Sequence, residues 1–317
     1  MSAAPQPRET LPVYLKIGLL SFGGPAGQIA LMQEECVTRR GWIGQEQFQR
    51  GLSIAMVLPG PEAQQLATWI GWRLGGMRGG LAAGLAFILP GAALMIGLAA
   101  VAANWGEVPL VQAIFTGVQP VVLLIVLRAL RAIAGKALAG PVDWALAGGA
   151  FIGLWGLGLP FPLIVALAAG FGCLRGCGRA ADPAGPPAPP GRGGVMPLII
   201  GGVLVLAVWL TIRLSLGAAP FDDIASLFTS AAFVSFGGAY ALLPYVADRA
   251  VETYGWLDAA QMLNGLALAE ATPGPLILVN TYAGYFAGHG AGQGWLTALL
   301  ATFYTFCLLY TSDAADD

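Results

Sequence analysis

Two Pro-Gly-Pro tripeptides are the residues of this chain whose types and spacing suit ligand binding. They are Pro59-Gly60-Pro61 and Pro273-Gly274-Pro275, and each stands in an apolar stretch. Proline ends a helix that precedes it and suits the first turn of the helix that follows. A helix that begins there directs N–H groups and a partial positive charge at its surroundings, which favours an anion. The pattern predicts an anion site, and kinks that allow close helix packing are the structural alternative.

Three charged residues near these tripeptides are candidates for coupling the anion to a proton or a membrane potential. Glu62 either favours the dipole of the helix that it begins or is a protonatable group beside the anion. Glu270 precedes the second tripeptide, where a helix C-terminus disfavours a carboxylate, so a functional role is the better interpretation. Lys16 either extends to the lipid headgroups or supplies a basic group that faces the site.

Charge repulsion predicts the state of Glu62 when an anion is bound. An ionised Glu62 would repel a dianion held beside it. We therefore expect Glu62 to be protonated in the bound state, which makes the affinity for the anion depend on pH.

Uncharged polar side chains also stand close to the tripeptides. They are suited either to donate hydrogen bonds to oxyanion oxygens or to bond neighbouring helices to one another. These residues are Gln64, Gln65, Thr68, Thr272, Asn280 and Thr281. No phosphate-binding loop, Ser/His/Asp set or zinc-ligand spacing is found, so we expect no enzyme, no metal and no cofactor.

The tripeptides belong to a duplicated segment. Residues 21–61 and 235–275 align without a gap at an offset of 214, with 14 identities in 41 pairs. The motif SFGG starts both copies, and Gly-Gly lets the backbone turn freely. Matched helix breaks in apolar surroundings indicate a transporter site made of discontinuous helices. The predicted substrate-binding residues are Ser21, Phe22, Gly23, Gly24, Pro59, Gly60, Pro61, Gln64, Ser235, Gly237, Gly238, Thr272, Pro273, Gly274 and Pro275.

Composition sets the class of protein. The chain has 317 residues, of which 57% are hydrophobic and 10% charged. A soluble domain carries roughly 25% charged residues. The sequence therefore predicts an all-α polytopic membrane protein, an inverted-repeat helical bundle with broken Gly-Gly and Pro-Gly-Pro helices.

The chain divides into five predicted parts. Broken elements are expected over 11–32 and 51–74, an interfacial segment between them, and spans over 79–103, 108–130, 142–158 and 161–173. The parts are a first repeat (11–178), a Pro/Gly-rich linker (179–194), a connecting transmembrane helix (195–217), an incomplete second repeat (220–306) and a tail (307–317). The tail, CLLYTSDAADD, looks like a translated sequencing adapter, and a genuine acidic tail is the alternative.

Basic residues predict the topology. Residues 6–103 hold seven Lys and Arg, whereas the matching window 220–317 holds only Arg249. Cytoplasmic flanks are enriched in these residues. We therefore expect Arg131 and the linker on the cytoplasmic side, Asp222 and His289 on the periplasmic side, and the two copies in opposite orientations.

The motifs together resemble a known family. Phe22-Gly23-Gly24-Pro25, Gly41-Trp42, residues 58–66 and Ala271-Thr272-Pro273-Gly274-Pro275 are similar to the chromate ion transporter (CHR) family in its long two-repeat form. The resemblance covers residues 11–306. It implies an inner-membrane carrier that exports chromate, with sulfate as a further candidate substrate.

The two copies differ at sites that the resemblance marks. Ala239 replaces Pro25, and Leu276 replaces Glu62, so the halves should contribute unequally. The expected partners are a small inorganic oxyanion and membrane lipid but no nucleic acid, and a homodimer is one possible assembly. We expect a multi-pass protein of the bacterial inner membrane that confers chromate resistance by efflux. An anion channel, or a carrier of another small inorganic anion, is the alternative.

Overall fold

The computed structural model describes most of the chain as helices. The described residues are 7–21, 24–57, 60–138, 140–159, 161–176, 206–207, 209–211, 213–214, 219–234 and 239–306. No strand is found among them. Two compact units are present, one formed by residues 1–119 and 193–317 and the other by 120–192. The expected connecting helix at 195–217 and the tail at 307–317 fall largely outside the described residues.

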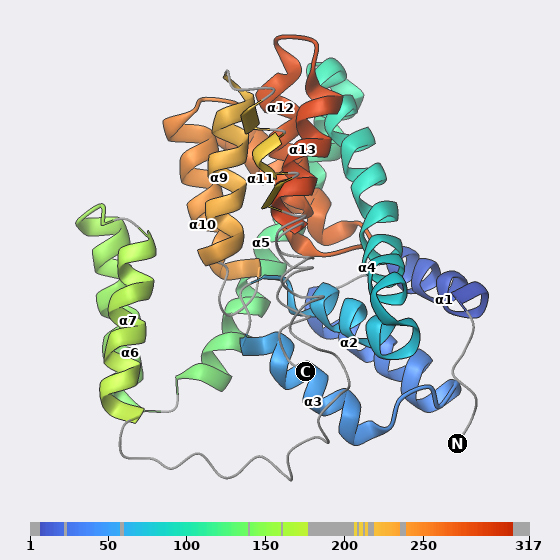
Figure 1. Ribbon diagram of the computed structural model, residues 1–317. Coiled ribbons are helices and arrows are strands. Elements are labelled where there is room, and N and C mark those ends of the chain that lie inside the picture. Colours follow the sequence, from blue (N-terminus) through green and yellow to red (C-terminus); the bar gives the residue numbers. More distant parts are fainter. Residues whose placement is uncertain are drawn as a thin grey trace. The chain divides into compact units, whose positions relative to one another are not determined.

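Helices separated by breaks make up the first copy (Figure 1). In chain order they are α1 (Pro7–Leu20), α2 (Gly24–Met32), the π-helical turn η1 (Gln33–Arg39), α3 (Gln45–Val57) and α4 (Glu62–Trp105). The predicted break after Ser21 is confirmed, because α1 ends at Leu20 and α2 starts at Gly24. The second predicted break is also confirmed, since α3 ends at Val57 and α4 begins at Glu62.

The second copy repeats these bounds. Its elements are α9 (Phe221–Val234), α10 (Ala239–Asp248), η3 (Arg249–Thr253), α11 (Ala259–Ala271), the 3-10 turn η4 (Leu276–Leu278), α12 (Val279–His289) and α13 (Gly294–Phe306). Both ends of α9 lie 214 residues after those of α1, and both ends of α11 lie 214 after those of α3. The duplication in sequence is therefore also a duplication of helix starts and stops.

Packing repeats as well. Helix α1 packs on α4, and its counterpart α9 packs on α13. Helix α4 is interrupted at Gly75 and Gly76, where Gly76 has φ 61°, and its two parts pack where Gly71 meets Gly79. In the second copy α12 and α13 form the matching pair, close together at Gly284 and Ala301. Small residues permit such close approach of helices.

The remaining helices connect and follow the first copy. Helix α5 (Pro109–Ala137) begins in the larger unit and ends in the smaller one. The smaller unit also holds α6 (Pro141–Phe151), the π-helical η2 (Ile152–Gly156) and α7 (Phe161–Gly176). Gly153 of η2 lies against Ile164 of α7. The spans expected over 142–158 and 161–173 thus correspond to helical segments.

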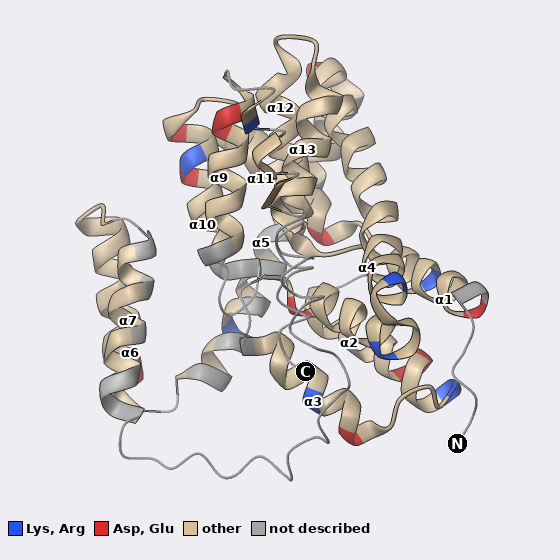
Figure 2. Cartoon of the chain, in the orientation of Figure 1, with Lys and Arg blue, Asp and Glu red and all other residues tan. Residues whose placement is uncertain are grey.

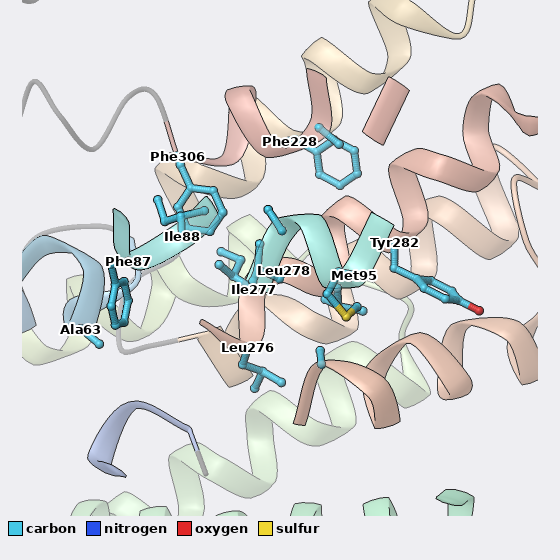
Figure 3. Close-up of a cluster of buried hydrophobic side chains, with 14 of the residues drawn as sticks. Ala63, Phe87, Ile88, Met95, Phe228, Leu276, Ile277, Leu278, Tyr282 and Phe306 are labelled. Atoms are coloured by element: carbon cyan, nitrogen blue, oxygen red, sulfur yellow. The ribbon is translucent and has the colours of Figure 1, made fainter. Parts of the chain in front are cut away.

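Residues from both copies form one core. Figure 3 shows Phe87, Ile88 and Met95 of α4 gathered around Leu276, Ile277 and Leu278 of η4. Phe228 of α9 and Phe306 of α13 belong to the same buried cluster. The two copies are therefore joined through apolar contacts in the middle of the larger unit.

Membrane character is visible on the outside of the helices. Among the described residues, α4 is the one helix long and apolar enough to cross a membrane, judged by length and composition. Exposed leucines recur every four residues on two helices, at Leu11, Leu15 and Leu19 of α1 and at Leu81, Leu85 and Leu89 of α4. Such stripes are unfavourable in water and are solvated by lipid.

Candidate binding site at the helix breaks

The break of the second copy lies against the first copy. The Gly274 N–H donates to the Ser21 carbonyl at 3.1 Å. The Gln28 side chain of α2 is fully buried, and its Nε2 donates to the Gly274 carbonyl at 2.6 Å. Both backbone groups of Gly274, at φ 114°, are thus held by residues of the other copy. The structure brings together Ser21 and Gly274, which were predicted site residues, whereas Gln28 was not predicted.

Helix α4 completes the surroundings of this break. A Cβ atom on Gly91 would lie 2.7 Å from Cδ1 of Leu278 and still closer to the Pro273 carbonyl oxygen. Glycine at this position therefore allows the Pro273–Gly274 backbone to lie directly on α4. Thr272 Oγ1 donates to Met95 Sδ at 3.5 Å. The second-copy tripeptide consequently contacts Ser21, Gln28 of α2 and Gly91 of α4.

The first-copy break places a helix start beside a buried amide. Gly60 has φ 124°, and Pro61 precedes α4 in an extended conformation. The N–H groups of Gln64 and Gln65 donate to the Pro61 carbonyl at 3.0 and 3.1 Å. Gln64 is fully buried, and within the described part of the chain neither polar atom of its side chain has a hydrogen-bond partner. A buried amide without partners is costly, and a polar ligand would relieve that cost.

The coupling candidates occupy three different environments. Glu62 is confirmed as the first residue of α4, it is half-buried, and no cation pairs with it among the described residues. Glu270 is buried in the last turn of α11. The side chain of Lys16 is partly exposed, and its Nζ is 2.8 Å from a carboxylate oxygen of Glu35.

Glu35 is a buried carboxylate that the sequence reading did not single out. Its side chain is 2% exposed and pairs with Lys16, Arg39 and Arg40. The hydrogen bond from Lys16, followed by those from the two arginines, lowers the pKa of Glu35 to about 2 despite its burial. The spacing of Glu35 and Arg39 on one turn was the available sequence signal. Three cations around one carboxylate leave this end of the larger unit basic.

The other predicted residues have assigned places where they are described. Ser21 Oγ donates to the Ile17 carbonyl of α1, the helix that ends one residue before Ser21. Asn280 Nδ2 donates to Thr305 Oγ1 at 3.2 Å, and the Thr281 and Thr302 hydroxyls are 2.8 Å apart. These two residues therefore join α12 to α13, the structural alternative to oxyanion binding. Several predicted positions lie outside the described residues, namely Phe22, Gly23, Pro59, Ser235, Gly237 and Gly238.

Comparison with known proteins decides the family. The profile of the Chromate transporter family matches residues 9–173 and 223–311, which is most of the chain. This chain belongs to the chromate transporter family. It is therefore a membrane protein of a transport family rather than of an enzyme family.

Curated relatives agree with this assignment. The chain is 32% identical to a chromate transport protein of Pseudomonas aeruginosa, over 94% of this chain and 71% of that protein. It is 29% identical to a probable chromate transport protein of Synechococcus elongatus, over 93% and 72% of the two chains. A chromate transport protein of Cupriavidus metallidurans is 28% identical, over 96% of this chain and 73% of its own length. No solved structure matches this member of the chromate transporter family.

Proposed function

We propose that the chain is a secondary transporter that moves tetrahedral oxyanions, chromate and also sulfate, across the bacterial inner membrane in the direction of efflux. The observation that carries the proposal is the enclosure of the Pro273–Gly274–Pro275 break by Ser21, Gln28 and Gly91 of the first copy. Broken backbone is tolerated at membrane depth where protein or a polar cavity satisfies it. Transporters of the inverted-repeat class bind their substrate at such places.

The chemistry at the breaks suits an oxyanion. The start of α4 offers first-turn N–H groups and the positive end of a helix dipole, and the amide of Gln64 lies buried two residues further on. Hydrogen-bond donors of this kind bind tetrahedral dianions by charge and size. Chromate and sulfate share both properties, and the relatives named as chromate transport proteins favour chromate as the substrate.

Electrical work favours export. A dianion that leaves a negative cytoplasm gains about 4.6 kcal/mol per 100 mV, because each charge contributes about 2.3 kcal/mol. Export by this route needs no proton to be electrically downhill. The excess of basic residues in the first copy supports the opposite orientation of the two copies and a multi-pass arrangement. In such a transporter one repeat moves against the other, so that the site opens alternately to the two sides of the membrane.

Counterflow tests the proposal. Proteoliposomes loaded with unlabelled sulfate should take up labelled sulfate transiently above its equilibrium level, and external chromate should compete. A carrier saturates and exchanges, whereas an anion channel dissipates the label without overshoot. Flux that neither saturates nor responds to internal sulfate would contradict the carrier and favour the channel.

A further inference from the structure

A cavity in the larger unit lies away from the helix breaks. Its volume is about 870 Å³, and it opens where α4 ends, α5 begins and α11 begins. Neutral polar side chains line much of it, among them Asn104, Gln112, Gln261 and Asn264. All of these residues belong to the larger unit. The cavity is wide enough for a hydrated inorganic ion.

Tyr282 lines the inner part of this cavity. The residue is fully buried, and its hydroxyl has no hydrogen-bond partner among the residues that the structure describes. Figure 3 shows the Tyr282 ring beside Met95, with the hydroxyl directed away from Met95 and Leu278. The Phe286 ring at 5.0 Å and the backbone of Gly265 hold the ring in place. Buried hydroxyl groups normally form a hydrogen bond, so this one is available to donate to a ligand.

The same tyrosine is close to the second-copy break. Tyr282 and Leu278 are four residues apart on the same helical face, and Leu278 contacts Gly91 and Gly274. Met95, beside Tyr282 in Figure 3, accepts the hydrogen bond from Thr272. One helical turn thus separates the inner end of the cavity from the Pro273–Gly274–Pro275 break.

Charge distinguishes the cavity from the ion-pair cluster around Glu35. Glu107 and Asp258 line the cavity, and no Lys or Arg does. Elsewhere in the larger unit Lys16, Arg39 and Arg40 surround Glu35, and Figure 2 shows basic residues near α1 and α3 and further ones near α9 and α10. Gly18, two residues after Lys16, lies against Ala86 and Phe87 of α4, and from Phe87 to Trp105 the helix α4 rises about 27 Å towards the cavity.

We propose that this cavity is the vestibule through which the oxyanion leaves the protein, with the Tyr282 hydroxyl as a transient donor at its inner end. The inference rests on the proposed function. Glu107 and Asp258 lower the concentration of anions in the vestibule, which speeds release and hinders recapture. The neutral donors bind the passing ion without retaining it. The charges change rates on this side and leave the overall equilibrium unchanged.

Neutralising Glu107 and Asp258, here called the rim, tests the electrostatic part of the vestibule proposal. Asp258 caps α11 by accepting from the Gln261 N–H at 2.7 Å, and asparagine caps equally well. In the double variant Asp258→Asn/Glu107→Gln, the KM for sulfate entering from the vestibule side should fall about three- to tenfold. Right-side-out and inverted membrane vesicles separate the two sides. The KM on the other side should not change.

Two matched variants complete the transport test. Glu46 is an exposed carboxylate that pairs with Arg50 and does not line the cavity. Glu46→Gln should therefore leave the KM of the vestibule side unchanged. Tyr282→Phe keeps the ring and should lower the maximal exchange rate about tenfold, whereas Tyr285→Phe on the same helix should not. Unchanged kinetics in both the rim variant and Tyr282→Phe, with an active parent, would overturn the vestibule. A parent without saturable exchange would overturn the proposed function itself.

A labelling measurement that needs no transport gives an independent check. Asn104→Cys places a thiol in the cavity wall. A cationic thiol reagent should modify it about tenfold faster than an anionic reagent of equal size, and the rim variant should bring the two rates together. Equal rates for the two reagents in the Asn104→Cys protein that keeps Glu107 and Asp258 would overturn the charged vestibule.

Discussion

Gln28 and Gly274 form the contact that most directly ties one copy to the other. They are 246 residues apart in sequence and are joined by a hydrogen bond of 2.6 Å inside the core. The repeat-equivalent residue of Gln28 is Leu242, so the second copy has no such donor. The interaction is therefore one-sided, in line with the unequal roles expected for the two halves.

Replacement of Gln28 by the residue of the other copy tests this contact. In Gln28→Leu the buried Gly274 carbonyl loses its donor, which should cost about 1–3 kcal/mol of stability and reduce counterflow. Gln33→Ala is the matched control, because Gln33 bonds Gln45 at the surface and should cost less than about 0.5 kcal/mol. Thermal unfolding in detergent measures both. A Gln28→Leu protein as stable and active as the parent would show that the contact is dispensable.

Glu62 is the residue at which pH should act on binding. An ionised carboxylate at the start of α4 would repel a dianion held there, so the protonated form should accompany the bound state. Glu62→Gln should preserve sulfate binding and flatten its dependence on pH, as measured by equilibrium binding of labelled sulfate. If the variant keeps the pH profile of the parent, Glu62 serves only to begin the helix.

Glu35 should make stability depend on pH in acid. Its pKa in the folded protein is about 2, below the value of about 4.3 for an unfolded chain. A lowered carboxylate pKa contributes stability above the unfolded value, and this contribution is lost as the pH falls from about 4.3 towards about 2. The unfolding temperature of the parent should therefore fall in this window more steeply than that of Glu35→Gln. Identical slopes would mean that the ion pairs with Lys16, Arg39 and Arg40 contribute nothing.

At the scale of elements, glycine sets how closely the broken helices pack. A Cβ atom on Gly265 of α11 would lie 2.7 Å from Cε1 of Tyr282, and one on Gly51 of α3 would lie 2.6 Å from Cζ3 of Trp69. The two glycines occupy equivalent positions of the two copies, and each faces an aromatic ring of the helix that follows. The close packing of these helices therefore explains why both copies have glycine at this position.

Alanine at these positions should separate the helices. Gly265→Ala should destabilise the protein by about 1–3 kcal/mol, because the Tyr282 ring must move. Gly97→Ala in α4 is the opposite control, since nothing lies within 4 Å of its added Cβ and alanine favours helix by about 1 kcal/mol. Unfolding temperatures that move in the same direction for both variants would contradict the close approach.

At the scale of the whole molecule, orientation of the copies is the property that transport requires. Thiol reagents that do not cross membranes should label Asp222→Cys and His289→Cys from the periplasm. They should label Arg131→Cys and cysteines placed in the 183–190 linker from the cytoplasm. This pattern follows from the excess of Lys and Arg in the first copy. Labelling of Asp222→Cys from the cytoplasm alone would make the repeats parallel.

The sequence by itself determined where helices start and stop. Proline and glycine act on their own backbone, so the breaks after Leu20 and before Glu62, and the recurrence of α1 and α3 as α9 and α11, were predictable from local chemistry. The same motifs carried the resemblance to the chromate transporter family. The residues 22–23, 58–59 and 235–238, in contrast, lie outside the described part of the chain, so their contribution to the site stays a prediction.

Only the tertiary structure decided which side chains meet. Nothing local marks Gln28 as a partner of Gly274, Glu35 as the partner of Lys16, or Tyr282 as the inner wall of a cavity formed with the ends of α4 and α11. Each of these contacts joins different elements, and burial of a polar group costs free energy unless the packing supplies a partner for it. Sequence spacing reports one helix at a time, whereas burial depends on all the helices that pack together.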